Sequence, residues 1–164
     1  MAVSANLKVW RVDGDDLTER EFPFLDIVPV TVKLDAEIIS GTPTDYSWDF
    51  GDGGTSTYKD PTHTFEDYGY QRVVLVISDI FGDTTYTADL FLSKLDFVAD
   101  QPTGEPPHTV QFTNTSQTPT GIQLSEWVWS FGDSFGATGV ANVSHTYTEY
   151  GNFNVSLGAT FIQL

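Results

Sequence analysis

Two histidines and a few aspartates are the residues whose types could do chemistry. Asp49 and Asp52 stand close together, and His63 and His145 each come two residues before an aromatic residue. Neighbouring carboxylates can bind a metal or act as an acid–base pair, but a calcium loop needs several further oxygen ligands at close spacing. We therefore interpret the carboxylates as turn-forming. Each histidine lacks a nearby cysteine or a second clustered ligand, which favours a hydrogen-bonded structural role.

Groupings typical of enzymes are missing from the sequence. It has no nucleophile elbow, no phosphate-binding glycine loop, no His-x-x-x-His motif and no cysteine pair. The acidic run Asp13-Gly14-Asp15-Asp16 is interpreted as a turn, with a calcium site as the alternative. We predict that the chain is not an enzyme and that it uses no cofactor and no metal.

One motif organises the chain because it occurs twice. The run Trp48-Asp49-Phe50-Gly51-Asp52-Gly53 returns 81 positions later as Trp129-Ser130-Phe131-Gly132-Asp133. The residues downstream of it repeat at a spacing of 82, and a period of this size indicates whole domains rather than a solenoid. The repeated positions are Trp48, Phe50, Gly51, Asp52, His63, Tyr68 and Gly69 in the first copy, and Trp129, Phe131, Gly132, Asp133, His145, Tyr150 and Gly151 in the second.

The motif itself predicts a strand followed by a tight turn. Trp48 and Phe50 are two residues apart, so on a strand they share one face and supply much of a small core. Gly51 and Asp52 then favour a turn, because glycine reaches positive φ easily and aspartate hydrogen-bonds to its own turn. Since threonine, valine, phenylalanine and tyrosine are abundant and apolar stripes at helical spacing are missing, the predicted class is all-β.

The two repeats closely resemble the PKD (polycystic kidney disease) domain family. The resemblance covers roughly residues 27–161 and implies two tandem immunoglobulin-like β-sandwiches, which serve mostly as spacers and binding modules. The second copy departs from the pattern at Ser130, where the family has Asp, and at Ser134, where it has Gly. Gln71 replaces an aromatic residue that Phe153 supplies in the second copy.

We predict three segments: an N-terminal arm (residues 1–24) with an extra strand at Leu7–Val12, a first domain (25–93) and a second domain (94–164). The second repeat is shorter than the first, because only 13 residues follow Gly151. It therefore lacks a counterpart of the last strand, predicted at Thr84–Leu92, and exposes an edge and part of its core. A truncated chain, a tolerated gap and a strand supplied from elsewhere remain open explanations. The Leu7–Val12 strand of a neighbouring copy is a donor to consider, giving a homo-oligomer by strand exchange.

Charge and composition exclude several partners. The 164 residues contain 23 acidic and 7 basic side chains, a formal charge of −16, and no cysteine. The negative electrostatic field of such a chain disfavours binding to nucleic acids and to anionic membrane surfaces. No segment has the roughly 18 apolar residues of a membrane helix, and the first residues do not resemble a secretory signal. We expect no nucleic-acid binding, no membrane insertion and packing without disulfides.

These observations favour a non-enzymatic structural protein with a protein partner. The favoured role is a phage virion protein, a capsid decoration or accessory protein that binds a capsid or surface lattice and lies on the virion surface. The alternative is an extracellular or cell-surface PKD pair: a spacer, carbohydrate-binding or protein-binding part of a secreted enzyme, surface-layer protein or adhesin. The candidate anchoring residues are apolar and lie outside the repeated core: Trp10, Phe22, Phe24 and Phe135.

Overall fold

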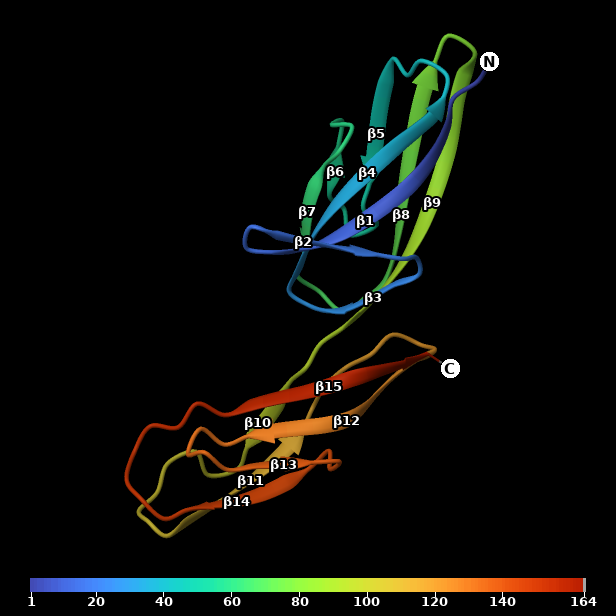
Figure 1. Ribbon diagram of the computed structural model, residues 1–164. Coiled ribbons are helices and arrows are strands. Elements are labelled where there is room, and N and C mark those ends of the chain that lie inside the picture. The colour runs from blue at the N-terminus through green and yellow to red at the C-terminus, as the bar shows by residue number, and fades with distance from the viewer. Residues whose placement is uncertain (164) are drawn as a thin grey trace. The chain divides into compact units, whose positions relative to one another are not determined.

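The computed structural model describes residues 1–163, which form fifteen β-strands and no helix (Figure 1). The chain divides into two compact units, Met1–Leu92 (domain 1) and Ser93–Leu164 (domain 2). Each unit is built from two sheets. The predicted all-β class with two tandem immunoglobulin-like sandwiches is confirmed.

Domain 1 contains a four-stranded and a five-stranded sheet. The first has the order β2-β1-β4-β7, formed by β1 (Ser4–Asp13), β2 (Asp16–Arg20), β4 (Val30–Ser40) and β7 (Thr62–Phe65). The second has the order β3-β9-β8-β5-β6, formed by β3 (Phe24–Ile27), β5 (Asp45–Asp49), β6 (Thr55–Ser56), β8 (Gly69–Asp79) and β9 (Gly82–Ser93).

The core of domain 1 follows from alternation along its longer strands. Successive side chains of a strand point to opposite faces, so every second residue is buried when one face is covered. On three of these strands the buried apolar positions are Val30, Val32, Leu34 and Ala36 of β4, Val73, Leu75 and Ile77 of β8, and Ala88, Leu90 and Leu92 of β9. Because β9 pairs with β8 along the whole length of β8, this core is closed on that side.

The first 24 residues differ from the predicted N-terminal arm, because β1 is an integral strand of domain 1. Val9 lies opposite Leu34 in the β1–β4 ladder and is fully buried. In domain 2, Ala99 lies opposite Phe112, the repeat equivalent of Leu34. Strand β1 is therefore the counterpart of the short strand at the start of domain 2. The sequence conceals this because β2 and β3 are inserted between β1 and the recognisable repeat.

Domain 2 contains two three-stranded sheets. The first has the order β10-β11-β14, formed by β10 (Phe97–Ala99), β11 (His108–Asn114) and β14 (Val143–Tyr147). The second has the order β13-β12-β15, formed by β12 (Ile122–Ser130), β13 (Gly136–Thr138) and β15 (Ser156–Gln163). The registers repeat those of domain 1, since Trp48 faces Leu75 across β5–β8 and Trp129 faces Leu157 across β12–β15.

Domain 2 has no counterpart of β9 among the residues that the structure describes. Within residues 1–163, strand β15 pairs with β12 on one side and with no strand on the other (Figure 1). The expectation that the second sandwich lacks its last strand is confirmed. The consequence is visible in burial: Val73 and Leu75 are fully buried, whereas their counterparts Val155 and Leu157 are only partly buried.

Candidate functional site

The repeated tryptophan lies at the centre of each core. Trp48 and Trp129 are each 1% exposed, and each indole N–H is satisfied by a backbone carbonyl. Nε1 of Trp48 donates to the Tyr58 carbonyl at 2.8 Å, and Nε1 of Trp129 donates to the Val140 carbonyl at 3.1 Å. A buried, hydrogen-bonded indole stabilises the sandwich and offers no surface to a ligand.

The glycine after each Trp-x-Phe run is required by both conformation and space. Gly51 has φ of +87° and Gly132 has φ of +80°, in the left-handed region that favours glycine. A Cβ on Gly51 would lie 2.8 Å from the Arg72 carbonyl oxygen, and one on Gly132 would lie 2.6 Å from the Asn154 nitrogen. The turn thus lets the chain after β5 lie directly against the backbone of β8, and the chain after β12 lie directly against the backbone of the segment that leads into β15.

The motif aspartates hold this turn. The Asp49 carboxylate accepts the Gly51 N–H at 2.9 Å, and the Asp52 carboxylate accepts the Gly54 N–H at 2.9 Å. In domain 2, Asp133 accepts the Phe135 N–H at 3.1 Å. These are the hydrogen bonds of turn-forming aspartates. No cluster of three or more potential metal-binding side chains occurs within residues 1–163.

Each motif histidine is held between an aspartate and an aromatic ring. His63 Nε2 lies 2.7 Å from Asp52 Oδ2, and the imidazole stacks on Phe50 with ring centroids 4.1 Å apart. In domain 2 the corresponding distances are 2.6 Å between His145 Nε2 and the Asp133 carboxylate and 4.1 Å between the His145 and Phe131 rings. Both histidines therefore tie the turn to the strand β7 or β14.

The histidine contacts change the acidity of the aspartates. Desolvation raises the pKa of Asp52, but the hydrogen bonds from His63 and the Gly54 N–H outweigh it, and the pKa lies below its usual value. Desolvation is likewise the largest single influence at Asp133, and the hydrogen bonds from His145 and the Phe135 N–H again lower the pKa overall. Both carboxylates are ionised at neutral pH and accept hydrogen bonds.

A His–Asp pair becomes catalytic when the imidazole also contacts a nucleophile or a substrate proton. In the part of the chain that is described, neither His63 nor His145 is hydrogen-bonded to a serine or threonine hydroxyl. Each imidazole is also covered by a second aromatic ring, because His63 contacts Phe65 and His145 contacts Tyr147 in an edge-to-face arrangement. The geometry supports a structural role.

The four candidate anchoring residues lie in different surroundings. Phe24 is 1% exposed in the core of domain 1 and is unsuited to anchoring a partner, because β3 turns it inward. Phe22 is partly buried against the same core. Trp10 is partly buried, with the Lys33 Nζ 5.8 Å from its ring centroid. Only Phe135 is largely exposed, at 68%.

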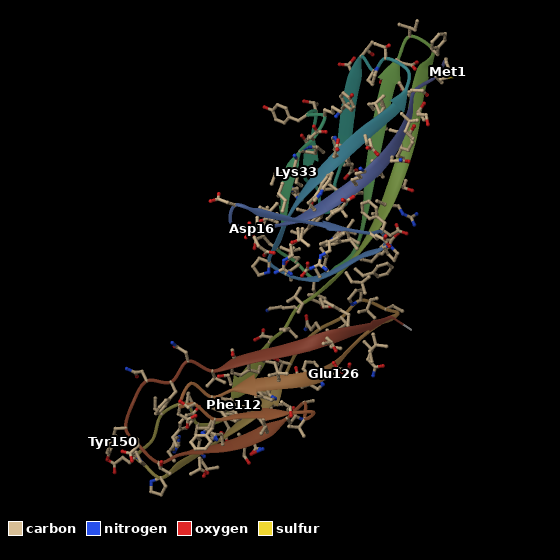
Figure 2. All side chains as sticks on the ribbon, viewed as in Figure 1. Met1, Asp16, Lys33, Phe112, Glu126 and Tyr150 are labelled. Atoms are coloured by element: carbon tan, nitrogen blue, oxygen red, sulfur yellow. The ribbon has the colours of Figure 1, made fainter. Side chains whose placement is uncertain are left out.

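Two further motif residues are on the surface. Tyr68 is 43% exposed and Tyr150 is 79% exposed, although both occur at the same place in the repeat. Tyr150 lies in the loop that leads into β15 (Figure 2). These tyrosines contribute little to the cores, since an exposed side chain gains little from burial.

The site that sequence reasoning did not locate is a cavity of about 610 Å³ in domain 2. Its apolar wall includes Phe97, Phe112, Tyr147, Phe153 and Val155. Aligning domain 2 with β8 and β9 of domain 1 would have located this cavity. In domain 1, β9 supplies the side chains that fill the corresponding space, and the described residues of domain 2 contain no such strand.

Comparison with known protein families agrees with this geometry. The family model described as PKD domain matches the chain twice, over residues 28–92 and 95–161. The two matches correspond to the two sandwiches and include both Trp-x-Phe-Gly-Asp turns. No helix that is long and apolar enough to cross a membrane is found in residues 1–163. The chain belongs to the PKD domain family and carries two of its domains in tandem.

Proposed function

We propose that this chain is a structural protein that displays PKD domains on the surface of a phage virion, as a capsid decoration or accessory protein. PKD domains are typically non-catalytic immunoglobulin-like modules of extracellular or surface proteins, so tandem copies suggest an interaction or spacer role. The virion is the assembly that we favour, and the capsid lattice is the proposed partner.

The observation that carries the proposal is the contrast between the two domains. Domain 1 is closed, because β9 covers the edge of β8 and buries Leu90 and Leu92. Domain 2 leaves β15 uncovered and Leu157 partly buried. We infer that domain 2, whose edge is open among the described residues, attaches to a larger assembly, while domain 1 is presented to solvent.

Surface chemistry is compatible with this role. The net charge of −16 favours solubility and disfavours unspecific binding to the nucleic acid that surrounds virion assembly. The absence of cysteine makes folding independent of the redox compartment. Phe135, exposed beside the His145 ring, is a candidate contact for the neighbouring copy or shell.

The experiment is to detect the chain in purified particles. Virions from the source would be banded on a density gradient and probed with an antibody raised against the purified chain, with the major shell protein as the reference. We expect a fixed ratio to the shell protein and gold labelling on the particle surface. Detection only as part of a longer secreted polypeptide in cell-free medium would refute the virion role.

A second candidate is a carbohydrate-binding spacer pair, favoured by one feature of domain 2. Trp127 lines a hollow of about 230 Å³ together with the amide side chains of Asn114 and Gln123. An indole beside amides is suited to stacking on and hydrogen bonding with a sugar ring. Saturable quenching of tryptophan fluorescence by soluble oligosaccharides, abolished by Trp127→Ala, would support this role. Unchanged fluorescence across a panel of oligosaccharides would exclude binding of those sugars there.

A further inference from the structure

The four-stranded sheet of domain 1 carries an apolar group on its outer face. Side chains alternate along β1, so Val9 points into the core and Trp10 points outward. Trp10 and Val12 are partly buried, and within residues 1–163 neither belongs to the side chains packed against the core. Leu17 of β2 lies opposite Val12 in the ladder and is 52% exposed. An aromatic residue and two aliphatic residues therefore meet on the solvent side of this sheet.

Two opposite charges flank Trp10 on the same face. Glu19 of β2 lies opposite Trp10 on one side, and Lys33 of β4 lies opposite Trp10 on the other. Cross-strand partners share a face, and neighbouring strands are about 4.8 Å apart, so the two charges lie at similar distances from the indole. Lys33 Nζ is 5.8 Å from the centroid of the Trp10 ring. Five side chains together form what we call the Trp10 face: Trp10, Val12, Leu17, Glu19 and Lys33.

The neighbouring lysines are already engaged in ion pairs. Lys8 Nζ lies 3.1 Å from the carboxylate of Glu37, and Lys59 Nζ lies 3.4 Å from that of Asp35. Within residues 1–163, the two charges beside Trp10 take part in no ion pair. One positive and one negative side chain of this face are therefore available to a partner that offers the opposite charges.

This sheet is also where an acidic chain can approach another copy of itself at the lowest electrostatic cost. The chain has 7 basic residues and a net charge of −16. Four of the 7 lie on three neighbouring strands: Lys8 and Arg11 on β1, Arg20 on β2 and Lys33 on β4. Two copies repel each other over most of their surface, and the repulsion is smallest where the basic side chains are concentrated.

We propose that the chain forms a symmetric dimer in which the Trp10 faces of two copies pack against each other. A two-fold axis that runs along β1 between the two facing sheets places Trp10 against Trp10 of the second copy. The same rotation brings Glu19 of each copy opposite Lys33 of the other, because the two residues flank Trp10 on opposite sides. A two-fold interface uses the same patch twice, so both ion pairs form together. This inference goes beyond the proposed function and does not rest on it.

The size of the face sets the strength of the dimer. Strands β1 and β4 pair over eight positions, which corresponds to about 25 Å of strand. The four strands of the sheet together are about 15–20 Å wide. The facing area is therefore on the order of 400–500 Å² per copy, at the low end of specific interfaces. We expect a weak dimer with a Kd on the order of 10–100 µM.

This contact differs from the exchange of the Leu7–Val12 strand considered from the sequence. Strand β1 is paired with β4 along one edge and with β2 along the other. Val9 is fully buried in its own domain. Donating β1 to another copy would unfold the first sheet of domain 1, whereas packing through the outer face leaves every strand in place.

The first test reverses one charge at a time. Sedimentation equilibrium of the purified full chain would measure the dimer Kd of the wild type, of Glu19→Lys and of Lys33→Glu. Each reversal is expected to weaken the dimer by about tenfold or more, because two like-charge contacts replace two ion pairs. The matched control Asp45→Lys, at an exposed position on the other sheet, is expected to leave the Kd unchanged. Glu19→Lys lowers the net negative charge, so general repulsion would predict the opposite effect.

The second test mixes the two variants. In a mixed dimer, Lys at position 19 of one copy faces Glu at position 33 of the other, and the second contact pairs the native Lys33 with the native Glu19. We expect Glu19→Lys and Lys33→Glu to associate with each other about as tightly as the wild type does with itself. Association in the mixture also shows that both variants are folded.

Each other outcome overturns the proposal. A wild-type chain that stays monomeric up to about 1 mM would show that the Trp10 face does not bind a second copy. A dimer that survives both charge reversals would be formed by another surface. Variants that remain apart when mixed would show that the face contacts something other than a second copy, such as another part of the same chain. The measurement uses purified protein, so its failure and the absence of the chain from virions are separate results.

Discussion

The strongest test of the difference between the two domains is a matched pair of leucine truncations. Leu75 and Leu157 occupy the same register position, opposite Trp48 and Trp129 respectively. Leu75 is fully buried, whereas Leu157 is partly buried beside the uncovered edge. We expect Leu75→Ala to destabilise domain 1 much more than Leu157→Ala destabilises domain 2.

The magnitudes follow from burial. Leu→Ala removes three carbon groups at about 0.8 kcal/mol each, and a residual cavity adds to this in a closed core, giving about 3–4 kcal/mol for Leu75. Leu157 loses less, because part of its side chain is already in contact with water and the open edge allows collapse. We expect about 1–2 kcal/mol there.

The assay is native-state hydrogen exchange on the full chain under increasing denaturant, which reports the opening free energy of each domain separately. Fluorescence alone would not separate the domains, since each contains two tryptophans: Trp10 and Trp48 in one, Trp127 and Trp129 in the other. The control is the double variant, whose two effects are expected to add if the domains respond independently.

Equal losses from the two truncations would refute the reasoning. They would mean that Leu157 is as fully enclosed in solution as Leu75, and hence that something covers the β15 edge in the isolated protein. A larger loss for Leu157→Ala would contradict the relation between burial and stability on which the comparison depends.

Three further predictions concern single positions. Ser134 adopts φ of +75° where the equivalent Gly53 has φ of +94°, so Ser134→Gly should stabilise domain 2 by up to about 1 kcal/mol in denaturant unfolding, and the reverse change Gly53→Ser should destabilise domain 1. Asp52→Asn should lower the free energy of unfolding by about 1–2 kcal/mol at pH 7. Because the pKa of Asp52 is lowered in the folded state, the extra stability of the wild type is present above about pH 4 and is lost as the pH falls through the folded pKa. The same pH dependence of wild type and variant in acid unfolding would contradict this prediction. Phe24→Ala should cost about 3–5 kcal/mol by thermal unfolding, since the ring is buried, while Phe135→Ala should change stability by less than about 0.5 kcal/mol; comparable losses would show that the burial of the two rings is misjudged.

The repeat, the fold class and the missing strand could be predicted from the sequence. The Trp-x-Phe-Gly-Asp run carries its own structure, because period-two alternation and a glycine that must adopt positive φ are local requirements. Their physical basis is visible in Gly51 and Gly132, whose neighbours leave no room for a Cβ. That the residues after Gly151 supply one strand, β15, and no counterpart of β9 was likewise predicted by counting the 13 residues that follow Gly151 in the given sequence.

Other features depended on contacts between distant residues. The pairing of β1 with β4, which places Val9 opposite Leu34, is hidden by the inserted β2 and β3. Apolar type alone did not separate Phe24, which is buried, from Phe135, which is exposed, because burial is decided by the strands that cover a residue.

The sequence by itself determined the local chemistry of this protein: two strand-and-turn motifs, an all-β class, a strongly acidic chain, and a second repeat in which the given residues after Gly151 supply one strand where the first repeat has two. Only the tertiary structure decided where the uncovered edge and the cavity beside it lie. The cavity beside Phe153 and Val155 is formed by side chains of the β10-β11-β14 sheet and of the segment 149–155 that leads into β15. A cavity of this kind has no sequence motif, since it arises from the packing of residues that are distant in the chain.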